Sequence, residues 1–416
     1  MNKVELLAPA GSVEKAKIAF KYGADAVYAG TAKLSLRTRA EMNSDTLEET
    51  IKYAHSIGKK VYVALNIYAH DEDYEEIEKE VKRLDSIGAD AIIASDVGVI
   101  EKIKEVAPNM EIHISTQANN VSLQSCKFWN KYGAKRIVLA RELSKEKIKY
   151  IMDNKPTDLE IEMFIHGAIC FAYSGRCYMS KYLANRCANQ GDCAQSCRWQ
   201  YNITASEVNN PDSKMNIDFD EKGTYLFSSK DMCLIRQIPT IIEMGVDSLK
   251  IEGRLKTDYY LATVVRTYRQ AIDEYLKLKE EGREGEYNAD KYLPELTKVK
   301  TRGLSEFYFS DDKNQDIHDF DGQSENLEYE YGAKVLNFDD KTDSYVVEIK
   351  NKLSLGDNLE ILYPDKIDVD KFIIEKLYDE KTDEEIDTIN PGKKGQLVKL
   401  KIPYKVEEGT IIRRKK

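Results

Sequence analysis

Four segments of the chain share one pattern, and this repetition constrains the fold more than any other feature. They are YGADAVYAG from Tyr22, IGADAIIAS from Ile87, YGAKRIVLA from Tyr132 and MGVDSLKIE from Met244. In each, a glycine follows a helix-like run and precedes a short apolar stretch. Glycine adopts the left-handed conformation of a helix C-cap at little cost because it has no Cβ. Each segment therefore predicts the end of a helix that leads into a strand.

Other short apolar strands fit between these segments. They are predicted at Val4–Pro9, Val61–Asn66, Ile112–Thr116 and Glu160–Gly167. Apolar residues at three- and four-residue spacing predict helices between most of the strands. Strands that alternate with helices indicate a parallel sheet, and eight such units in about 255 residues predict a (β/α)8 TIM-type barrel. An open doubly wound sheet is the alternative, although no G-x-G-x-x-G motif follows the first strand.

The rest of the chain sets the expected domains. We expect the barrel over residues 1–283, with a cysteine-rich insertion at about 168–232 after strand seven. An extension over 284–327 and a small C-terminal β-barrel domain over 328–416 would follow, since alternating patterns such as DSYVVEIKN and DNLEILY predict strands there. The basic tail RRKK is interpreted as exposed to solvent, with phosphate binding as the alternative.

Polar residues at the C-terminal ends of the barrel strands are the first functional candidates, because active sites of such barrels lie there. Arg141, His166 and Arg254 are favoured, since a cation at a barrel mouth suits an anionic substrate. The competing interpretation for any one residue is ordinary solvation of a strand end. The other polar residues at these ends are Asn66, Ser95, Asp96, Thr116, Gln117 and Glu252.

Charge and composition narrow the setting. The net charge of −10 argues against indiscriminate coating of nucleic acid, which needs excess Lys and Arg. No apolar run approaches a membrane span, and the first residues have no secretory pattern. We therefore expect a cytoplasmic protein without a membrane partner. Cysteines stay reduced in that compartment, so a cluster of them indicates a metal or catalysis before disulfides.

Five of the seven cysteines lie within one short stretch, residues 170–197. Cys170, Cys177, Cys193 and Cys197 have the spacing C-x6-C-x15-C-x3-C, and four thiolates suit either Zn²⁺ or an iron–sulfur cluster. The six-residue gap between the first two is unusual for a zinc knuckle. Spacing alone therefore leaves a cluster, zinc and unligated thiols open. Cys187 and Cys233 are possible substitute ligands, and Cys233 is expected at the start of the helix before strand eight.

A family resemblance adds to these observations. The segment EMFIHGAICFAYSGRCYMS (Glu162–Ser180) resembles the signature of the collagenase-like peptidase U-32 family. The opening ELLAPAGSVEKAKIAFKYGADAVYAG, the segment NQGDCAQSCRWQY and the segment SLKIEGRLKTDYY are similar to that family as well. The resemblance covers most of residues 3–270. The chain looks most like the branch that supports hydroxylation of tRNA.

The resemblance implies a specific activity and cofactor. It implies oxygen-independent, prephenate-dependent 5-hydroxylation of the wobble uridine in a tRNA anticodon loop. It also implies a [4Fe–4S] cluster held by the four cysteines Cys170, Cys177, Cys193 and Cys197. Prephenate would be the co-substrate, and a paired copy of a related protein would be a partner. The alternatives are a U-32 peptidase and a non-catalytic iron–sulfur subunit of a hydroxylase, although no G-x-S-x-G or H-E-x-x-H motif supports a peptidase.

The implied reaction gives the candidate residues roles. Arg37, Arg39, Arg141 and Arg254 are candidates for clamping the two carboxylates of prephenate, with tRNA phosphates as the alternative for Arg37. His166 would transfer a proton or only form a hydrogen bond. Aromatic residues beside the cysteines, Tyr173, Tyr178 and Trp199, would stack on the base or shield the cluster. The remaining expected substrate-binding residues are Asn66, Gln117 and Glu252.

Overall fold

The computed structural model describes residues 4–31, 34–35, 41–201, 203–207, 210–217, 228–310, 317–319, 328–391 and 395–416. The chain divides into two compact units. The first unit comprises Met1–Val13, Ala26–Leu255 and Thr301–Glu325. The second comprises Glu14–Asp25, Lys256–Lys300 and Asn326–Lys416.

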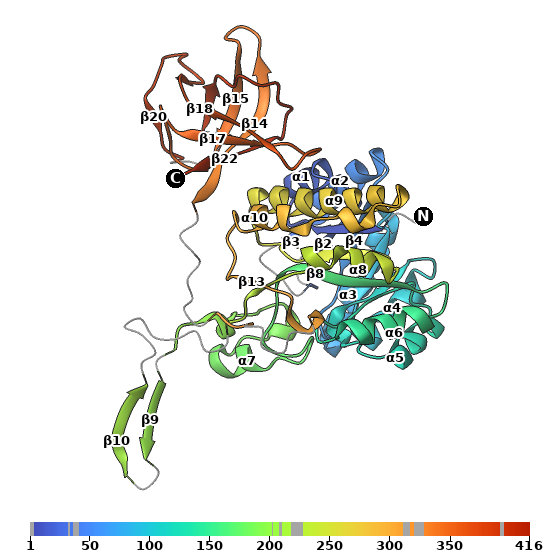
Figure 1. Ribbon diagram of the computed structural model, residues 1–416. Coiled ribbons are helices and arrows are strands. Elements are labelled where there is room, and N and C mark those ends of the chain that lie inside the picture. The colour runs from blue at the N-terminus through green and yellow to red at the C-terminus, as the bar shows by residue number, and fades with distance from the viewer. Residues whose placement is uncertain are drawn as a thin grey trace. The chain divides into compact units, whose positions relative to one another are not determined.

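The first unit is built on a closed parallel barrel (Figure 1). The last barrel strand, β12, pairs in parallel with both β1 and β8 and so closes the ring. The predicted TIM-type (β/α)8 barrel is confirmed, and the open doubly wound sheet is excluded because a closed ring has no edge strands. The barrel strands are β1 (Glu5–Pro9), β2 (Ala26–Thr31), β4 (Lys60–Ala64), β5 (Ala91–Ala94), β6 (Ile112–Ile114), β7 (Arg136–Val138), β8 (Glu160–Ala168) and β12 (Ser248–Ile251).

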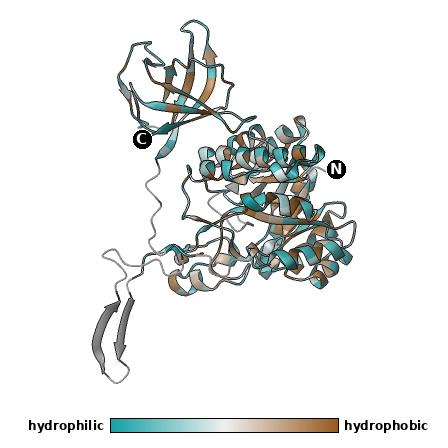
Figure 2. Ribbon diagram, viewed as in Figure 1, coloured by the Kyte–Doolittle hydropathy of each residue, from teal (hydrophilic) through white to brown (hydrophobic). Residues whose placement is uncertain are grey.

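Helices with one buried side connect the strands, and they carry both hydrophilic and hydrophobic residues (Figure 2). Polar caps start them: the Asp96 carboxylate accepts hydrogen bonds from the N–H groups of Gly98 (2.9 Å) and Val99 (3.1 Å) at α4. The repeated glycines end them, as Gly88 does with a φ of 78°. The helices of this unit include α2 (Ser44–Ser56), α3 (Tyr74–Ser86), α4 (Val97–Val106), α5 (Leu123–Lys131), α6 (Lys145–Asn154) and α8 (Ile238–Glu243).

Ionic groups lie inside the barrel together with apolar ones. The Glu162 carboxylate of β8 is fully buried and pairs with Lys250 Nζ of β12 at 2.7 Å and with Arg136 Nη1 of β7 at 3.2 Å. Burial alone would raise the pKa of Glu162, but the two cations lower it below its ordinary value. Removing one partner would leave a buried charge uncompensated. The apolar neighbours in the interior are Leu7, Ala26, Tyr28, Tyr62, Ala64, Ala91 and Ile93.

A long insertion follows β8 and carries the five clustered cysteines. It contains α7 (Met179–Ala184), the short helices η3 (Ala188–Gln190) and η4 (Ser196–Arg198), and the antiparallel pair β9 (Ile203–Glu207) and β10 (Asn210–Ile217). It returns as β11 (Asp231–Cys233), which pairs antiparallel with the end of β8 and parallel with β13 (Leu304–Ser305).

The expected position of Cys233 at the start of a helix is wrong. Cys233 ends β11, where it lies opposite His166 of β8. Pairing between residues so far apart in sequence is not visible in local periodicity, which reads the run that follows, LIRQIPTII, as a helix from its start. The helix α8 begins only at Ile238.

The second unit contains an antiparallel β-domain, residues 328–416, together with α1 (Val13–Lys21, from Glu14 on), α9 (Asp258–Glu280) and α10 (Leu293–Leu296). The predicted C-terminal β-domain is confirmed. Its seven-stranded sheet has the order β18-β17-β22-β14-β15-β21-β19. The strands are β14 (Tyr329–Asp339), β15 (Ser344–Ile349), β17 (Asn358–Leu362), β18 (Val369–Ile373), β19 (Leu377–Asp379), β21 (Leu397–Leu400) and β22 (Ile411–Lys415), and the short strands β16 (Leu353–Ser354) and β20 (Thr388–Ile389) pair apart from them.

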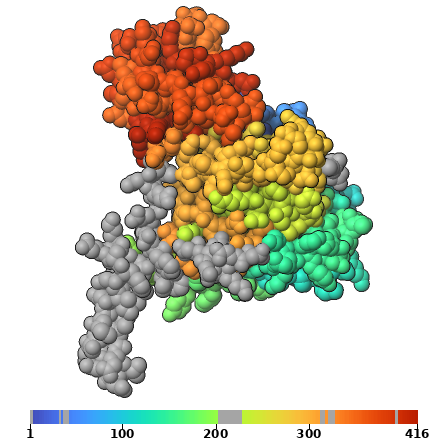
Figure 3. Space-filling model, in the orientation of Figure 1, coloured from blue at the N-terminus to red at the C-terminus, as the bar shows by residue number. Residues whose placement is uncertain are grey.

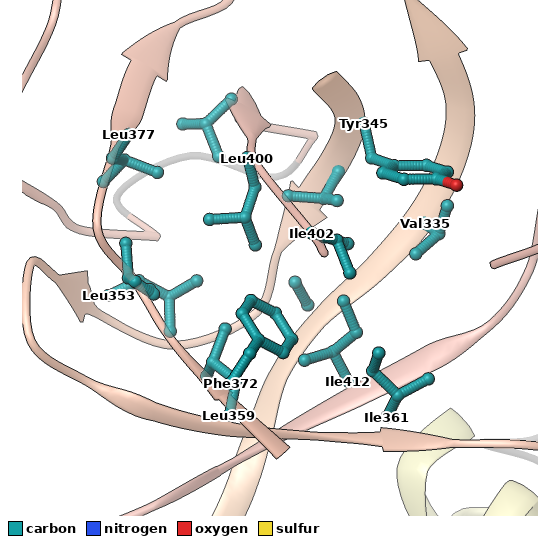
Figure 4. Packing of buried hydrophobic residues seen from close by; sticks show 14 of the residues in the cluster. Val335, Tyr345, Leu353, Leu359, Ile361, Phe372, Leu377, Leu400, Ile402 and Ile412 are labelled. Carbon is teal, nitrogen blue, oxygen red and sulfur yellow. The ribbon is translucent and has the colours of Figure 1, made fainter. Parts of the chain in front are cut away.

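Apolar side chains from opposite parts of this sheet meet in one core (Figure 4). Val335, Leu359, Ile361, Leu400 and Ile412 are among its buried members. The residues of the β-domain are drawn in orange to red in the space-filling view (Figure 3). This core gives the domain a hydrophobic interior distinct from that of the barrel.

The basic tail does not extend into solvent as expected. Arg413 is fully buried, and its guanidinium pairs with Glu295 of α10 at 2.8 Å and with Glu360 of β17 at 2.6 Å. Arg414 pairs with Asp357 at 3.0 Å. The tail forms β22 in the middle of the sheet, which turns one of its side chains inward. Neither a free tail nor phosphate binding by Arg413 is compatible with this arrangement.

In the part of the chain that the structure describes, we find no helix that combines the length and apolar character needed to cross a bilayer.

Candidate functional site

The loop between Cys170 and Cys177 is fastened to the C-terminal ends of the barrel strands. The Tyr68 hydroxyl, beyond the end of β4, donates to the carbonyl oxygen of Gln117 (2.7 Å), which follows β6. The backbone of Gly175 lies so close that a Cβ there would be 2.0 Å from the same oxygen, and its φ is +73°. Glycine is therefore needed to seat this loop.

Two further contacts hold the same loop. The backbone N–H of Ser174 donates to a carboxylate oxygen of Glu142 at 2.5 Å. Glu142 lies four residues beyond the end of β7. The Ser174 hydroxyl lies 3.4 Å from that of Thr116, which follows β6. The cysteine-bearing loop thus lies over the mouth of the barrel on the side of β4, β6 and β7.

Three of the predicted ligand cysteines lie within electrostatic reach of the fourth, Cys197. Burial raises the pKa of the Cys197 thiol, Arg198 opposes this, and the charges of Cys170, Cys193 and Cys177 raise that pKa further. All seven cysteines lie in described parts of the chain and none is in a disulfide.

Hydrogen-bond donors surround one of these sulfurs. The backbone N–H of Gln195 points to Cys193 Sγ at 3.4 Å, and the Ser180 hydroxyl lies 3.7 Å from it. That hydroxyl also accepts from the N–H of Ala194 at 2.9 Å, which fixes its position. Such donors stabilise a thiolate and tune a metal bound to it.

The thiols of the insertion are of the kind that an iron–sulfur cluster takes. Four thiolates are the ligands that a [4Fe–4S] cluster takes, and Cys193 has a backbone N–H donor toward its sulfur. Among the described residues, no three or more His, Cys, Asp or Glu side chains converge as a site for a single metal ion. Cys187 lies in the same segment, and its carbonyl accepts from the N–H groups of Gln190 and Asp192.

A second group of side chains gathers at the ends of β7, β8 and β12. Arg141 forms an ion pair with Glu252 at 3.7 Å, and its guanidinium lies 3.8 Å from the centre of the Phe164 ring. The Tyr28 hydroxyl lies 3.4 Å from the Glu252 carboxylate. Arg141 and Glu252 are therefore held against one wall of aromatic rings, in an orientation set by packing.

Two more cations lie beside the same rings. Lys250 Nζ is 4.4 Å from the centre of the Tyr28 ring, and the Arg254 guanidinium is 5.8 Å from it. Arg254 Nη1 also contacts the Ser35 hydroxyl at 3.4 Å, and a Cβ at Gly30 would be 2.2 Å from that nitrogen. Three cations around two rings, with Glu252 as a nearby counter-charge, make this mouth suited to a carboxylate-bearing ligand.

We call Arg141, Lys250 and Arg254 the cation group. Strand β8 connects this group with the first cysteine of the insertion, Cys170. At Gly167, with a φ of +105°, a Cβ would lie 2.5 Å from the carbonyl oxygen of Glu252. The strand therefore passes directly against Glu252 three residues before Cys170.

The remaining predicted residues are placed as follows. Asn66 donates to the Ser115 hydroxyl at 3.3 Å, at the ends of β4 and β6. His166 is only 1% exposed and lies within β8 between β11 and β12. Tyr173 is 65% exposed in the cysteine loop. Arg37 and Arg39 lie outside the described residues. Asp96, as a helix cap, has a local role instead.

Sequence reasoning missed several residues that build the site. Lys250 and Tyr28 lie inside short strands. A charged residue in such a strand, as Lys250 is, could have identified an inward-facing position, whereas Tyr28 gives no such signal. Glu142 and Tyr68 follow strand ends by a few residues. Their contacts to the cysteine loop depend on that loop folding back, which no local pattern encodes.

The cysteine segment itself carries exposed aromatic side chains. Large apolar side chains are normally not exposed in numbers in one segment, and such patches mark interaction surfaces. Basic residues of the same segment, including Arg176 and Lys181, lie among them in sequence. The exposed aromatic residues are Phe171, Tyr173, Tyr178, Tyr182 and Trp199.

Comparison with known proteins gives matches over nearly the whole chain. Residues 11–319 match the model of peptidase family U32, and residues 328–413 match that of the peptidase family U32 C-terminal domain. The chain is 37% identical to tRNA hydroxylation protein P1 of Bacillus subtilis (strain 168), over 100% of this chain and 96% of that protein.

Two further relatives act on RNA according to their names. Identity to tRNA hydroxylation protein P of Escherichia coli (strain K12) is 37%, covering 88% of this chain and 87% of the relative. Identity to 23S rRNA 5-hydroxycytidine C2501 synthase of the same organism is 34%, covering 87% of this chain but only 53% of the relative.

Proposed function

The chain belongs to peptidase family U32. We propose that, within this family, it hydroxylates tRNA rather than cleaving peptides. The observation that carries the proposal is the match along the full chain to a tRNA hydroxylation protein, which includes both the barrel and the β-domain. The cysteine segment over the barrel mouth supports it, because a redox reaction needs such a group and peptide hydrolysis does not.

We further propose the finer chemistry that the sequence resemblance implies. The substrate would be the wobble uridine of a tRNA anticodon loop, hydroxylated at carbon 5 with prephenate as co-substrate. Cys170, Cys177, Cys193 and Cys197 would hold a [4Fe–4S] cluster, and Cys187 would not. When bound, such a cluster supplies one-electron transfer.

The cation group at the mouth would bind prephenate. Its two carboxylates match the guanidinium groups of Arg141 and Arg254, which offer paired N–H donors. Glu252 holds Arg141 through the 3.7 Å ion pair. Lys250 Nζ forms an ion pair with Glu162 at 2.7 Å, so it would contribute positive potential at the mouth without contacting prephenate directly. These residues orient the co-substrate beside the end of β8.

The exposed aromatic residues of the cysteine segment would receive the RNA. A base of an anticodon loop is already partly unstacked, so moving it against Tyr173 or Tyr178 costs less than it would in a duplex. His166, buried within β8, could only act on a proton that reaches the strand end. Its burial favours a positioning role over direct proton transfer to solvent-borne groups.

Nucleoside analysis tests the proposal. The gene is deleted in a strain without a second family member, and tRNA is digested and measured by mass spectrometry for 5-hydroxyuridine derivatives. Loss of these nucleosides, restored by the wild-type gene but not by a Cys170→Ser gene, is the expected result. Unchanged nucleosides would refute the proposal.

Two controls separate the rival activities. Purified protein is incubated with denatured collagen, and no cleavage above a heat-inactivated sample is expected. A Cys187→Ser gene should restore the nucleosides as the wild type does. Cleavage of collagen that disappears in an Arg141→Met variant would favour a peptidase instead.

A further inference from the structure

A groove of about 890 Å³ lies on the surface of the C-terminal β-domain. Three chain segments border it: the turn between β14 and β15, the end of β18 with the residues after it, and the segment after β21. All of these belong to the second unit. The activity proposed above for the barrel does not use this groove.

The floor and the rim of the groove differ in character. Tyr345, Phe372 and Ile402 form part of the floor, and all three are buried members of the hydrophobic core (Figure 4). Phe338 and Ile373 stand on the rim with 45% and 54% of their surface exposed. The Phe338 ring packs edge-on against Tyr345 at 4.8 Å between centroids, which leaves one side of it available for a planar ligand.

The rim is basic, although the chain as a whole carries a net charge of −10. Four exposed lysines, Lys371, Lys376, Lys401 and Lys405, border the groove against two acids, Asp343 and Glu375. Lys401 pairs with Asp343 at 3.3 Å, and Lys371 pairs with Glu360 at 3.2 Å. Within the described residues, Lys376 and Lys405 have no ion pair.

We propose that this groove binds a single-stranded segment of RNA. Lysines along a groove neutralise successive phosphates, and an exposed ring gives a base a surface on which to stack. An acidic protein surface would be attracted by the lysines alone, and its carboxylates would not stack on the Phe338 ring. The inference rests on the proposed function in one respect, namely that the RNA is the substrate of the barrel site.

Binding of a labelled RNA to the full-length protein tests the groove. Fluorescence anisotropy is measured with a fluorescein-labelled, 12-nucleotide single-stranded RNA at several salt concentrations. In the Lys376→Glu/Lys405→Glu variant, the dissociation constant should rise about tenfold or more, and the log–log salt slope should fall by about 1.4, or 0.7 per lost phosphate contact. Phe338→Ala should weaken binding at least about fivefold.

Matched variants control for charge and for loss of a ring. Lys352→Glu/Lys381→Glu makes the same charge change at exposed lysines of the same domain that do not line the groove. Phe128→Ala removes an exposed ring from α5 of the barrel unit. Both controls should bind the RNA within about twofold of the wild type.

The outcomes decide between the occupants. Equal weakening of RNA binding by the groove variant and its lysine control would overturn the proposal, because binding would then depend only on the overall charge of the domain. Full binding by Phe338→Ala would also overturn it, because no base would then stack on the ring. Displacement of the RNA by poly-glutamate at equal charge concentration would indicate an acidic protein instead. If the deletion strain kept its hydroxylated nucleosides while RNA binding still depended on the groove, the proposed hydroxylase function would be refuted and the groove proposal would stand.

Discussion

The backbone of Gly175 lies against the carbonyl oxygen of Gln117, so closely that a Cβ on Gly175 would be 2.0 Å from that oxygen. This contact joins the middle of the cysteine loop to the residue that follows β6. It means that the positions of Cys170 and Cys177 are set by the barrel and not only by their own loop.

Gly175→Ala should therefore displace the loop. The added methyl group collides with backbone, and the φ of +73° is strained for any residue with a Cβ. We expect the iron content of anaerobically purified protein to fall to less than half that of the wild type. Gly285→Ala is the control, because a Cβ there meets nothing within 4 Å. Full iron content in Gly175→Ala would contradict this role of the contact.

Single replacements of the cysteines should separate ligands from bystanders. Cys170→Ser, Cys177→Ser, Cys193→Ser and Cys197→Ser should each lose most of the iron and the visible absorbance of the anaerobic protein. Cys187→Ser should keep both, because four thiolates complete the ligand set. Stoichiometric zinc in a colourless wild-type protein would overturn the cluster assignment.

Arg141→Met should impair use of prephenate. It removes a guanidinium that is paired with Glu252 and packed on Phe164. Truncating one partner of a largely desolvated charge contact costs about 2 kcal/mol or more, so kcat/KM for prephenate should fall at least about 30-fold. Lys147→Met, which removes an exposed charge from α6, should leave it unchanged. A fall in both variants would mean that general charge is responsible.

The β-domain should lose stability in acid through Glu295. Its carboxylate lies between Arg266 and Arg413 at 2.6 and 2.8 Å, and although burial opposes them these cations lower its pKa from 4.5 to about 2. A lowered folded-state pKa gives stability that is present above about pH 4.5 and is lost as the pH falls toward 2. The amount is on the order of 3 kcal/mol.

Hydrogen exchange of peptides from residues 328–416 would measure this loss. Protection should decrease between pH 4.5 and 2 in the wild type, after correction for the intrinsic exchange rate. Glu295→Gln should be less protected already at pH 7, since it takes the carboxylate partner from the buried Arg266 and leaves the buried Arg413 with Glu360 alone. It should also show a flatter pH dependence. An unchanged pH profile in Glu295→Gln would contradict the assignment.

Much of the fold was accessible from the sequence because the repeated unit is local. The glycines at helix ends, such as Gly88 and Gly133, and the apolar runs after them encode the alternation of helix and strand. The eight barrel strands were all expected near their observed positions. Arg413 was interpreted incorrectly, because its burial depends on Glu295 and Glu360, which local pattern does not connect to it.

The sequence by itself determined the barrel, the β-domain and the identity of the clustered cysteines, since hydrophobic periodicity and residue spacing are properties of neighbouring residues. Only the tertiary structure decided which side chains face one another. The contact of Gly175 with Gln117, the cation group around Tyr28, and the basic groove of the β-domain each combine segments far apart in the chain. Long-range packing and charge pairing fix such contacts, and no local pattern records them.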